Sequence, residues 1–160
     1  MALRTYGLID VLRRNAATAG ARAAFVFEGQ TVTHAEHLGR VERLAAALSV
    51  AGVRPGDRIA IIADNSPDFV AAYGAAAWLG AILTPVNWRL SADEIAYIVG
   101  DAAPALVLAS VAHQATLRAQ RAEYASVRRW IGTGGGAEPF EDLAGLVARA
   151  GAAPAPHPGA

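Results

Sequence analysis

The sequence predicts an α/β fold, with a mainly parallel sheet, helices on both faces and a small hairpin near the amino terminus. Short apolar runs alternate along the chain with segments of helical periodicity. The run RIAIIA, at residues 58–63, is apolar without alternation, which is typical of a strand covered on both faces. Strands and helices in this order fold through right-handed crossovers into a parallel sheet.

The first third of the chain predicts a helix, a hairpin and a second helix. Four residues give the first helix one apolar side: Leu8, Ile9, Val11 and Leu12. The segment AAFVFEGQTVTH, residues 23–34, alternates around Glu28-Gly29-Gln30 as a hairpin does. Thr33 and Glu36 have the spacing of a capping box, and Gly52 ends the helix that they open.

Two strand–helix units follow. After RIAIIA, Ser66-Pro67 supplies an N-cap and a first-turn proline for a helix that runs to about Gly80. AILTPV, residues 81–86, is the next strand. Ser91 and Glu94 form a second capping box, for a helix that ends near Gly100.

The last third predicts two more strands, two more helices and a tail. PALVLAS (residues 104–110) and VRRWIGT (127–133) are expected strands, and VAHQATLRAQRAEYA (111–125) and FEDLAGLVARAG (140–151) are expected helices. The proline- and alanine-rich tail, residues 152–160, cannot bury a core face, so we expect a linker or a truncated end there. The folded unit is then residues 1–151.

Composition excludes several classes of function. Acidic and basic residues are equal in number, at 14 each, so bulk charge does not favour nucleic acid. The chain has no cysteine and no lysine, which excludes thiolate nucleophiles, Schiff bases and a lysine clamp on phosphate. The amino terminus lacks the apolar core of a secretory signal, and we expect a cytoplasmic protein.

One stretch is long enough to cross a bilayer. Phe69 to Trp88 carries no charge. Its alanine-rich content, Gly80 and Pro85 favour a buried helix followed by a buried strand. We therefore expect no transmembrane segment.

Three candidate sites are disfavoured. The turn DNSPDF has no glycine for a pyrophosphate, and Asp64 and Asp68 repel one. The glycines at 132–136 follow a strand but lack the lysine and hydroxyl of a P-loop, so a flexible loop is favoured. His34 and His37 have no third ligand nearby in sequence, and we expect no metal site. No G-x-S-x-G motif is present, and we assign no catalytic residue.

The segment PVNWRL, residues 85–90, is the best candidate for a binding site. It follows a strand and precedes a capped helix. Arg89 can bind a phosphate bidentately beside the aromatic face of Trp88. The alternative is that Trp88 packs on the helix and Arg89 pairs with Asp93 or Glu94. The residues by themselves leave these two interpretations equal.

Three segments resemble a known family. TVTHAEH (residues 31–37), GVRPGDRIAIIADNSPDFV (52–70) and WLGAILTPVNWRLSADEIAYI (78–98) resemble, in order and spacing, the amino-terminal part of adenylate-forming (AMP-binding) enzymes. The likeness is closest to fatty-acid and other acyl-CoA ligases and covers about Tyr6 to Gly151. His34 stands where the opening motif of the family has an aromatic residue.

The resemblance implies a partial subdomain of the acyl-CoA synthetase fold. Enzymes of this family use ATP and Mg²⁺ to convert a carboxylic acid to an acyl-adenylate, which CoA then attacks. Their ATP loop, adenine site and carboxy-terminal lysine have no counterpart here, so the expected chain is an amino-terminal fragment that binds no cofactor and is inactive by itself. By family resemblance, Arg89 contacts a phosphate of CoA.

The expected partners are the remainder of the ligase, the carboxylic acid and CoA, and a homo-oligomer is an open alternative. The rival function is a non-catalytic docking or dimerisation module with the same fold.

Overall fold

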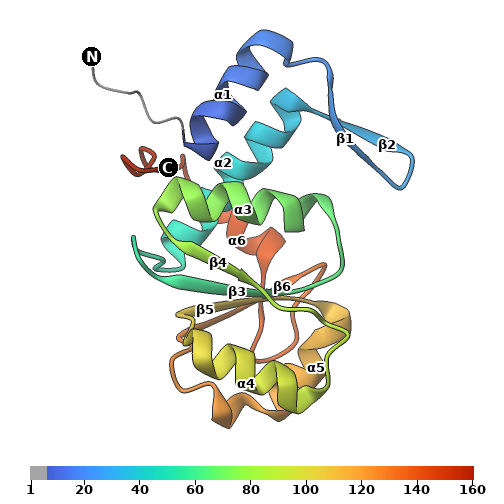
Figure 1. Ribbon diagram of the computed structural model, residues 1–160, viewed down its shortest axis with the longest axis vertical. Helices are drawn as coiled ribbons and strands as arrows, with labels where there is room; N and C mark the ends of the chain where they lie inside the picture. The colour runs from blue at the N-terminus through green and yellow to red at the C-terminus, as the bar shows by residue number, and fades with distance from the viewer. Residues whose placement is uncertain (1–6) are drawn as a thin grey trace.

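The computed structural model describes residues 7–160, which form a parallel sheet between two layers of helices (Figure 1). The helices are α1 (Leu8–Ala19), α2 (His34–Val50), α3 (Pro67–Leu79), α4 (Ala92–Ala102), α5 (Val111–Ala119), the 3₁₀ helix η1 (Arg121–Glu123) and α6 (Leu143–Arg149). The strands are β1 (Ala23–Phe27), β2 (Gln30–Thr33), β3 (Arg58–Ile62), β4 (Ile82–Pro85), β5 (Leu106–Ser110), β6 (Arg129–Thr133) and β7 (Glu141–Asp142). The predicted fold class is confirmed. Tyr6, where the family resemblance begins, lies outside the described residues.

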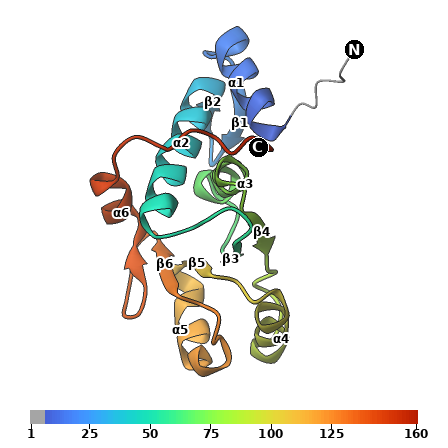
Figure 2. The same cartoon turned by 90° about the vertical axis from the view of Figure 1, so that its left-hand side faces the viewer.

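The five strands of the main sheet lie in the order β4-β3-β5-β6-β7, and every neighbouring pair is parallel. In β3, Ile59 and Ile61 pack in the core under α1, α2, α3 and α6, whereas Ala60 and Ile62 pack in the core under α4 and α5. Figure 2 shows these two helix layers on opposite sides of the strands. The continuous apolar run of β3 is thus explained by burial on both faces.

A separate hairpin joins α1 to α2. β1 and β2 are antiparallel, and the turn between them has Glu28 at φ 49° and Gly29 at φ 77°. Two successive left-handed residues form the tight turn whose twist matches paired strands. The Thr33 capping box is present, with Glu36 N donating to Thr33 Oγ1 (3.2 Å) and Thr33 N donating to the Glu36 carboxylate (2.8 Å).

The uncharged stretch Phe69–Trp88 is divided between two elements. Helix α3 ends at Leu79, Gly80 takes a left-handed φ of 67°, and β4 starts at Ile82. The expected helix and strand are therefore both present. Within residues 7–160, no helix is both long enough and apolar enough to span a membrane.

Three elements differ from the sequence expectation. Helix α5 was expected to reach residue 125 but stops at Ala119, because Tyr124 turns into the core beside Trp130 and donates its hydroxyl to Gln120 (3.0 Å). The short strand β7 was not foreseen. Helix α6 starts at Leu143, three residues later than expected, because the Asp142 carboxylate caps it by accepting from Gly145 N (3.1 Å).

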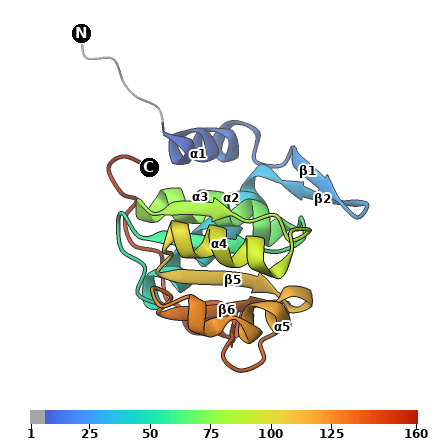
Figure 3. The ribbon, with the colours of Figure 1, turned by 60° about the horizontal axis from the view of Figure 1, so that its bottom comes forward.

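Residues 152–160 form neither helix nor strand. They pass beside α3 and end near the start of α1, as Figure 3 shows. Whether the domain boundary lies at Gly151 stays a prediction.

Candidate functional site

An open groove lies where β3 and β4 end. Its volume is about 550 Å³. The lining residues come from the ends of the two strands and the start of α3: Ala63, Asp64, Asn65, Phe69, Pro85, Val86, Asn87, Trp88 and Arg89. The carboxyl ends of parallel strands are the usual ligand-binding edge of an open α/β sheet. PVNWRL therefore lies where the sequence placed it.

The turn after β4 is shaped by Asn87. Val86 N donates to Ile61 O (2.9 Å) and so extends the pairing with β3. The Asn87 carboxamide then accepts from Arg89 N (3.0 Å), and its main-chain oxygen accepts from Leu90 N (3.2 Å). This is an Asx turn, which fixes the backbone that carries Trp88 and Arg89. Asn87 was not predicted to have a role from the sequence.

Four side chains form a stack along this edge. The Arg89 guanidinium carbon lies 4.4 Å from the centroid of the Trp88 ring. The Trp88 and His113 rings are stacked, with centroids 5.3 Å apart and planes at 23°. His113 Nε2 lies 3.5 Å from the Asp64 carboxylate. We call Asp64, His113, Trp88 and Arg89 the strand-end stack. Cation–π contact and ring stacking restrict the directions in which the exposed Arg89 can point.

The contacts of Arg89 do not match the interpretation in which it pairs with Asp93 or Glu94. Glu94 is engaged by Ser91, whose backbone N and hydroxyl both donate to the carboxylate (2.8 Å each). These side-chain and backbone hydrogen bonds lower the pKa of Glu94. Within residues 7–160, Arg89 has no carboxylate within 4.0 Å. Its guanidinium is therefore exposed over an indole and open to an external acceptor.

The turn DNSP between β3 and α3 is a helix cap. Ser66 Oγ accepts from Phe69 N (3.1 Å), and Asp68 lies 3.8 Å from Arg40. Asp68 stands in the first turn of α3, where a negative charge stabilises the helix dipole.

The glycine-rich loop after β6 is held by a buried glutamine. Gln114 Nε2 donates to Gly135 O (2.9 Å) and Ala109 O (3.3 Å), and Gln114 Oε1 accepts from Ala137 N (3.2 Å). Gly132 has no room for a side chain, because a Cβ there would overlap the carbonyl oxygen of Gly135. The sequence favoured a flexible loop and did not indicate that Gln114 holds it. The side-chain amide of Gln114, buried on α5, is the feature that was missed.

Of the two histidines of α2, His37 packs in the interior. His37 is 7% exposed and meets the edge of the Phe25 ring, with centroids 5.4 Å apart. Burial lowers the pKa of His37, and the nearby charges of His34 and Arg40 lower it further. No group of three or more metal-ligating side chains is found in the described part of the chain.

Comparison with known proteins gives the family. Residues 12–155 match the AMP-binding enzyme family. The long-chain-fatty-acid–CoA ligase FadD13 of Mycobacterium tuberculosis is 31% identical over 142 residues, which are 85% of this chain and 28% of that ligase. A feruloyl-CoA synthase of Amycolatopsis is 36% identical over 91 residues, which are 57% of this chain and 18% of the synthase.

Solved structures agree. A Rhodopseudomonas palustris protein assigned as a long-chain-fatty-acid CoA ligase superposes with a TM-score of 0.85 at 41% identity, over 91% of this chain and 37% of that chain. The N-terminal domain of FACL13 from M. tuberculosis gives a TM-score of 0.83 at 29% identity, over 95% of this chain and 38% of that chain. The chain thus spans well under half the length of each of these proteins. It belongs to the AMP-binding enzyme family and matches the amino-terminal part of its acyl-CoA ligases.

Proposed function

We propose that this chain is the amino-terminal subdomain of an ATP-dependent acyl-CoA ligase. In such an enzyme the carboxylate attacks the α-phosphate of ATP to give an acyl-adenylate and pyrophosphate, and the CoA thiol then displaces AMP to give a thioester. The supporting relatives include ligases for fatty acids and for 4-hydroxybenzoate or benzoate. The observation that supports a binding role for this chain is the strand-end stack beside an open groove.

Arg89 is the proposed contact to CoA. Its guanidinium is exposed and stacked on Trp88, and the described part of the chain offers it no ion pair. A guanidinium offers five N–H donors in a planar fork that fits two phosphate oxygens at once. Among the described residues that line the groove, Arg89 is the only basic one. We assign to Arg89 the binding of a phosphate of the CoA nucleotide.

The residues present do not fit ATP and Mg²⁺. Octahedral Mg²⁺ takes oxygen ligands, and residues 7–160 bring together no cluster of carboxylates that could hold it. The chain has no lysine for a phosphate, and the start of α3 presents Asp64 and Asp68. We propose that adenylation depends on sequence beyond Ala160 and that the 160-residue chain is inactive alone.

The test compares two proteins. One is the 160-residue chain, and the other is the chain extended by the coding sequence that follows Ala160. The extended protein should show acid-dependent ATP–pyrophosphate exchange and CoA thioester formation, whereas the 160-residue chain should match a protein-free control in both assays. Exchange by the short chain would refute its proposed inactivity. Absence of both reactions from a folded extended protein, across aliphatic and aromatic acids, would refute the ligase assignment.

A docking or dimerisation module is the second candidate. β4 is one of the two edge strands of the described sheet, and its residue Ile82 is 55% exposed. An unpaired strand edge with an apolar side chain favours association. Light scattering during size-exclusion chromatography tests this candidate. A monomer at high concentration would contradict it.

A further inference from the structure

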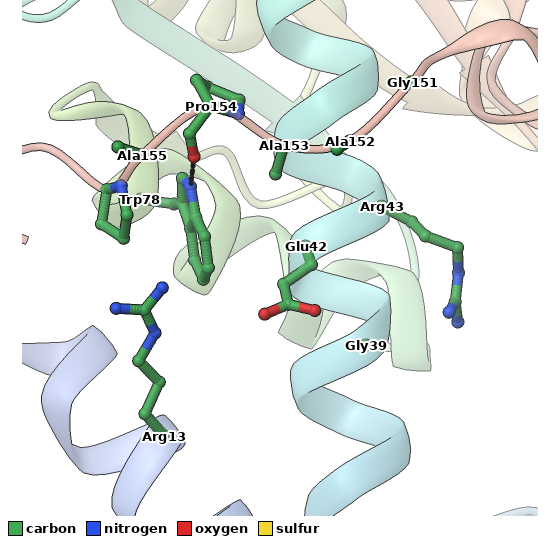
Figure 4. Close-up of a pocket in the computed structure, with 11 residues that line it drawn as sticks. Arg13, Gly39, Glu42, Arg43, Trp78, Gly151, Ala152, Ala153, Pro154 and Ala155 are labelled. Carbon is green, nitrogen blue, oxygen red and sulfur yellow. Dashed lines mark hydrogen bonds between the residues drawn. The ribbon is translucent and has the colours of Figure 1, made fainter.

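A second groove lies at the other end of α3, between α1, α2 and α3. The walls on the helix side are Arg13, Gly39, Glu42, Arg43 and Trp78, and the remaining wall is the chain's own tail, residues 151–156 (Figure 4). The tail brings to it an alternating sequence, APAPHP, at residues 153–158.

Two hydrogen bonds fix the tail to one tryptophan. The indole Nε1 of Trp78 donates to Pro154 O (2.7 Å), drawn as a dashed line in Figure 4. His157 N donates to the main-chain oxygen of Trp78 (2.8 Å). Trp78 thus holds the tail through its side chain and through its backbone, at positions three residues apart.

Packing continues beyond the hydrogen bonds. The His157 ring lies against Gly80, where a Cβ would come within 2.6 Å of the ring. Gly159 N donates to His157 Nδ1 (3.2 Å) and Ala160 N donates to His157 O (2.9 Å), so the tail turns after His157. Ala153 and Ala160 pack against the main core.

Helix α1 reaches the same indole. The Arg13 guanidinium carbon lies 4.7 Å from the centroid of the Trp78 ring, and Figure 4 shows Arg13 and Pro154 approaching Trp78 from different sides. Of the residues in α1, only Ile9 is buried. Arg13 of α1 and the tail thus contact the same side chain of α3.

Extended proline-rich segments suit such a groove. They form no internal hydrogen bonds, so their carbonyl oxygens are free to accept from an indole N–H. Proline also restricts the unbound segment, which lowers the entropy cost of docking. We infer that the surface of α1, α2 and α3 around Trp78 is a docking site for an alanine- and proline-rich extended segment, that residues 152–157 of the same chain dock there and so form one wall of the groove, and that the docked tail straps α1 to α3.

Hydrogen exchange of the full 160-residue chain, followed by NMR, tests the inference. The His157 amide and the Trp78 indole N–H should exchange slowly in the wild type. In Trp78→Phe, which keeps an aromatic ring but removes the donor, the His157 amide should exchange about five- to tenfold faster, the effect of losing one hydrogen bond.

His157→Ala is the second variant, because an exposed tail residue can be changed without unfolding the domain. Exchange at the Trp78 indole and in the α1 amides should both increase. Pro158→Ala, in the same tail and also exposed, is the control and should change neither.

Three results would overturn the inference. The first is wild-type exchange of the His157 amide as fast as in a free peptide. The second is slow exchange at the Trp78 indole and α1 that His157→Ala does not alter. The third is protection that rises with protein concentration together with a dimeric mass, which would assign the groove to the tail of a second copy.

Discussion

Two tryptophans, Trp78 and Trp88, carry an arginine over the ring, yet their surroundings differ. Trp78 lies near the end of α3, is 3% exposed and has Arg13 at 4.7 Å. Trp88 follows β4, is half-buried and has Arg89 at 4.4 Å. At the first site, the chain's own tail forms one wall of a groove, and Pro154 O accepts the indole N–H. The groove at the second site is lined by no residue of the tail.

From this difference we infer that the Trp78 site contributes to stability and the Trp88 site to binding. At Trp78, the indole N–H is satisfied within the chain by Pro154 O, and the contacts of this residue link α1, α3 and the tail. At Trp88, the stack with His113 supports a guanidinium that stays exposed. A positioned, exposed cation in a groove is suited to an external anion. We therefore expect substitutions at the first site to act on folding and those at the second to act on ligands.

The largest expected effect is on the free energy of unfolding. Trp78→Ala should lower it by about 3–5 kcal/mol, because a large buried side chain is removed and a cavity remains. Trp88→Ala should cost less, about 1–2 kcal/mol, because that ring is only half-buried, stacked on His113 and packed at the edge of the core under α4 and α5. Urea denaturation of both variants measures the difference. Equal losses of unfolding free energy would contradict the claim that the Trp78 site contributes more to stability than the Trp88 site.

The next prediction concerns Gln114, which holds the glycine-rich loop after β6, near the strand ends. Gln114→Leu should lower the free energy of unfolding by about 1–3 kcal/mol, because the carbonyls of Ala109 and Gly135 and the amide of Ala137 each lose a hydrogen bond in a buried or partly buried place. Exchange of the Ala137 amide should also become faster. Gln30→Leu, at an exposed position of the hairpin, is the matched control. If both variants retain wild-type stability and Ala137 exchange, the loop does not depend on Gln114.

A smaller effect should appear with pH, near the hairpin. Burial lowers the pKa of His37 below the usual 6.5, so the unfolded chain binds a proton more readily than the folded chain does. Stability contributed by neutral His37 should be complete above about pH 6.5 and should be lost as the pH falls below it. Thermal denaturation at pH 7.5 and 5.5 measures this loss. In His37→Phe the loss should shrink, and an unchanged difference would assign the pH dependence to other groups.

Much of the fold was predictable because its boundaries are marked by local chemistry. Thr33 and Ser91 begin helices through capping boxes, and Gly80 ends one in a left-handed conformation. These features depend on residues within four positions of one another. Strand β7 pairs only two residues with β6, which is too short for periodicity to show.

The candidate site was predictable only in part. Arg89 and Trp88 stood out because they follow a strand directly. His113 did not, because it lies 25 positions beyond Trp88 in the sequence, and only the parallel pairing of β3 with β4 and β5 brings the strand ends together. The docked tail was also missed. Its composition is that of a linker, and its binding depends on a groove formed by three helices distant in sequence.

The central claim is that Arg89 binds a CoA phosphate, and the two half-reactions of the extended ligase test it most directly. Arg89→Ala should raise the CoA requirement about ten- to a hundredfold, equivalent to about 1.5–3 kcal/mol, and leave adenylation nearly unchanged. Arg89→Lys should recover only part, because an ammonium does not reproduce the bidentate fork. Arg13→Ala, at the arginine that lies over Trp78, should leave the CoA requirement unchanged. If Arg89→Ala leaves CoA dependence as it was, or slows both half-reactions equally, Arg89 is a structural residue and the claim is wrong.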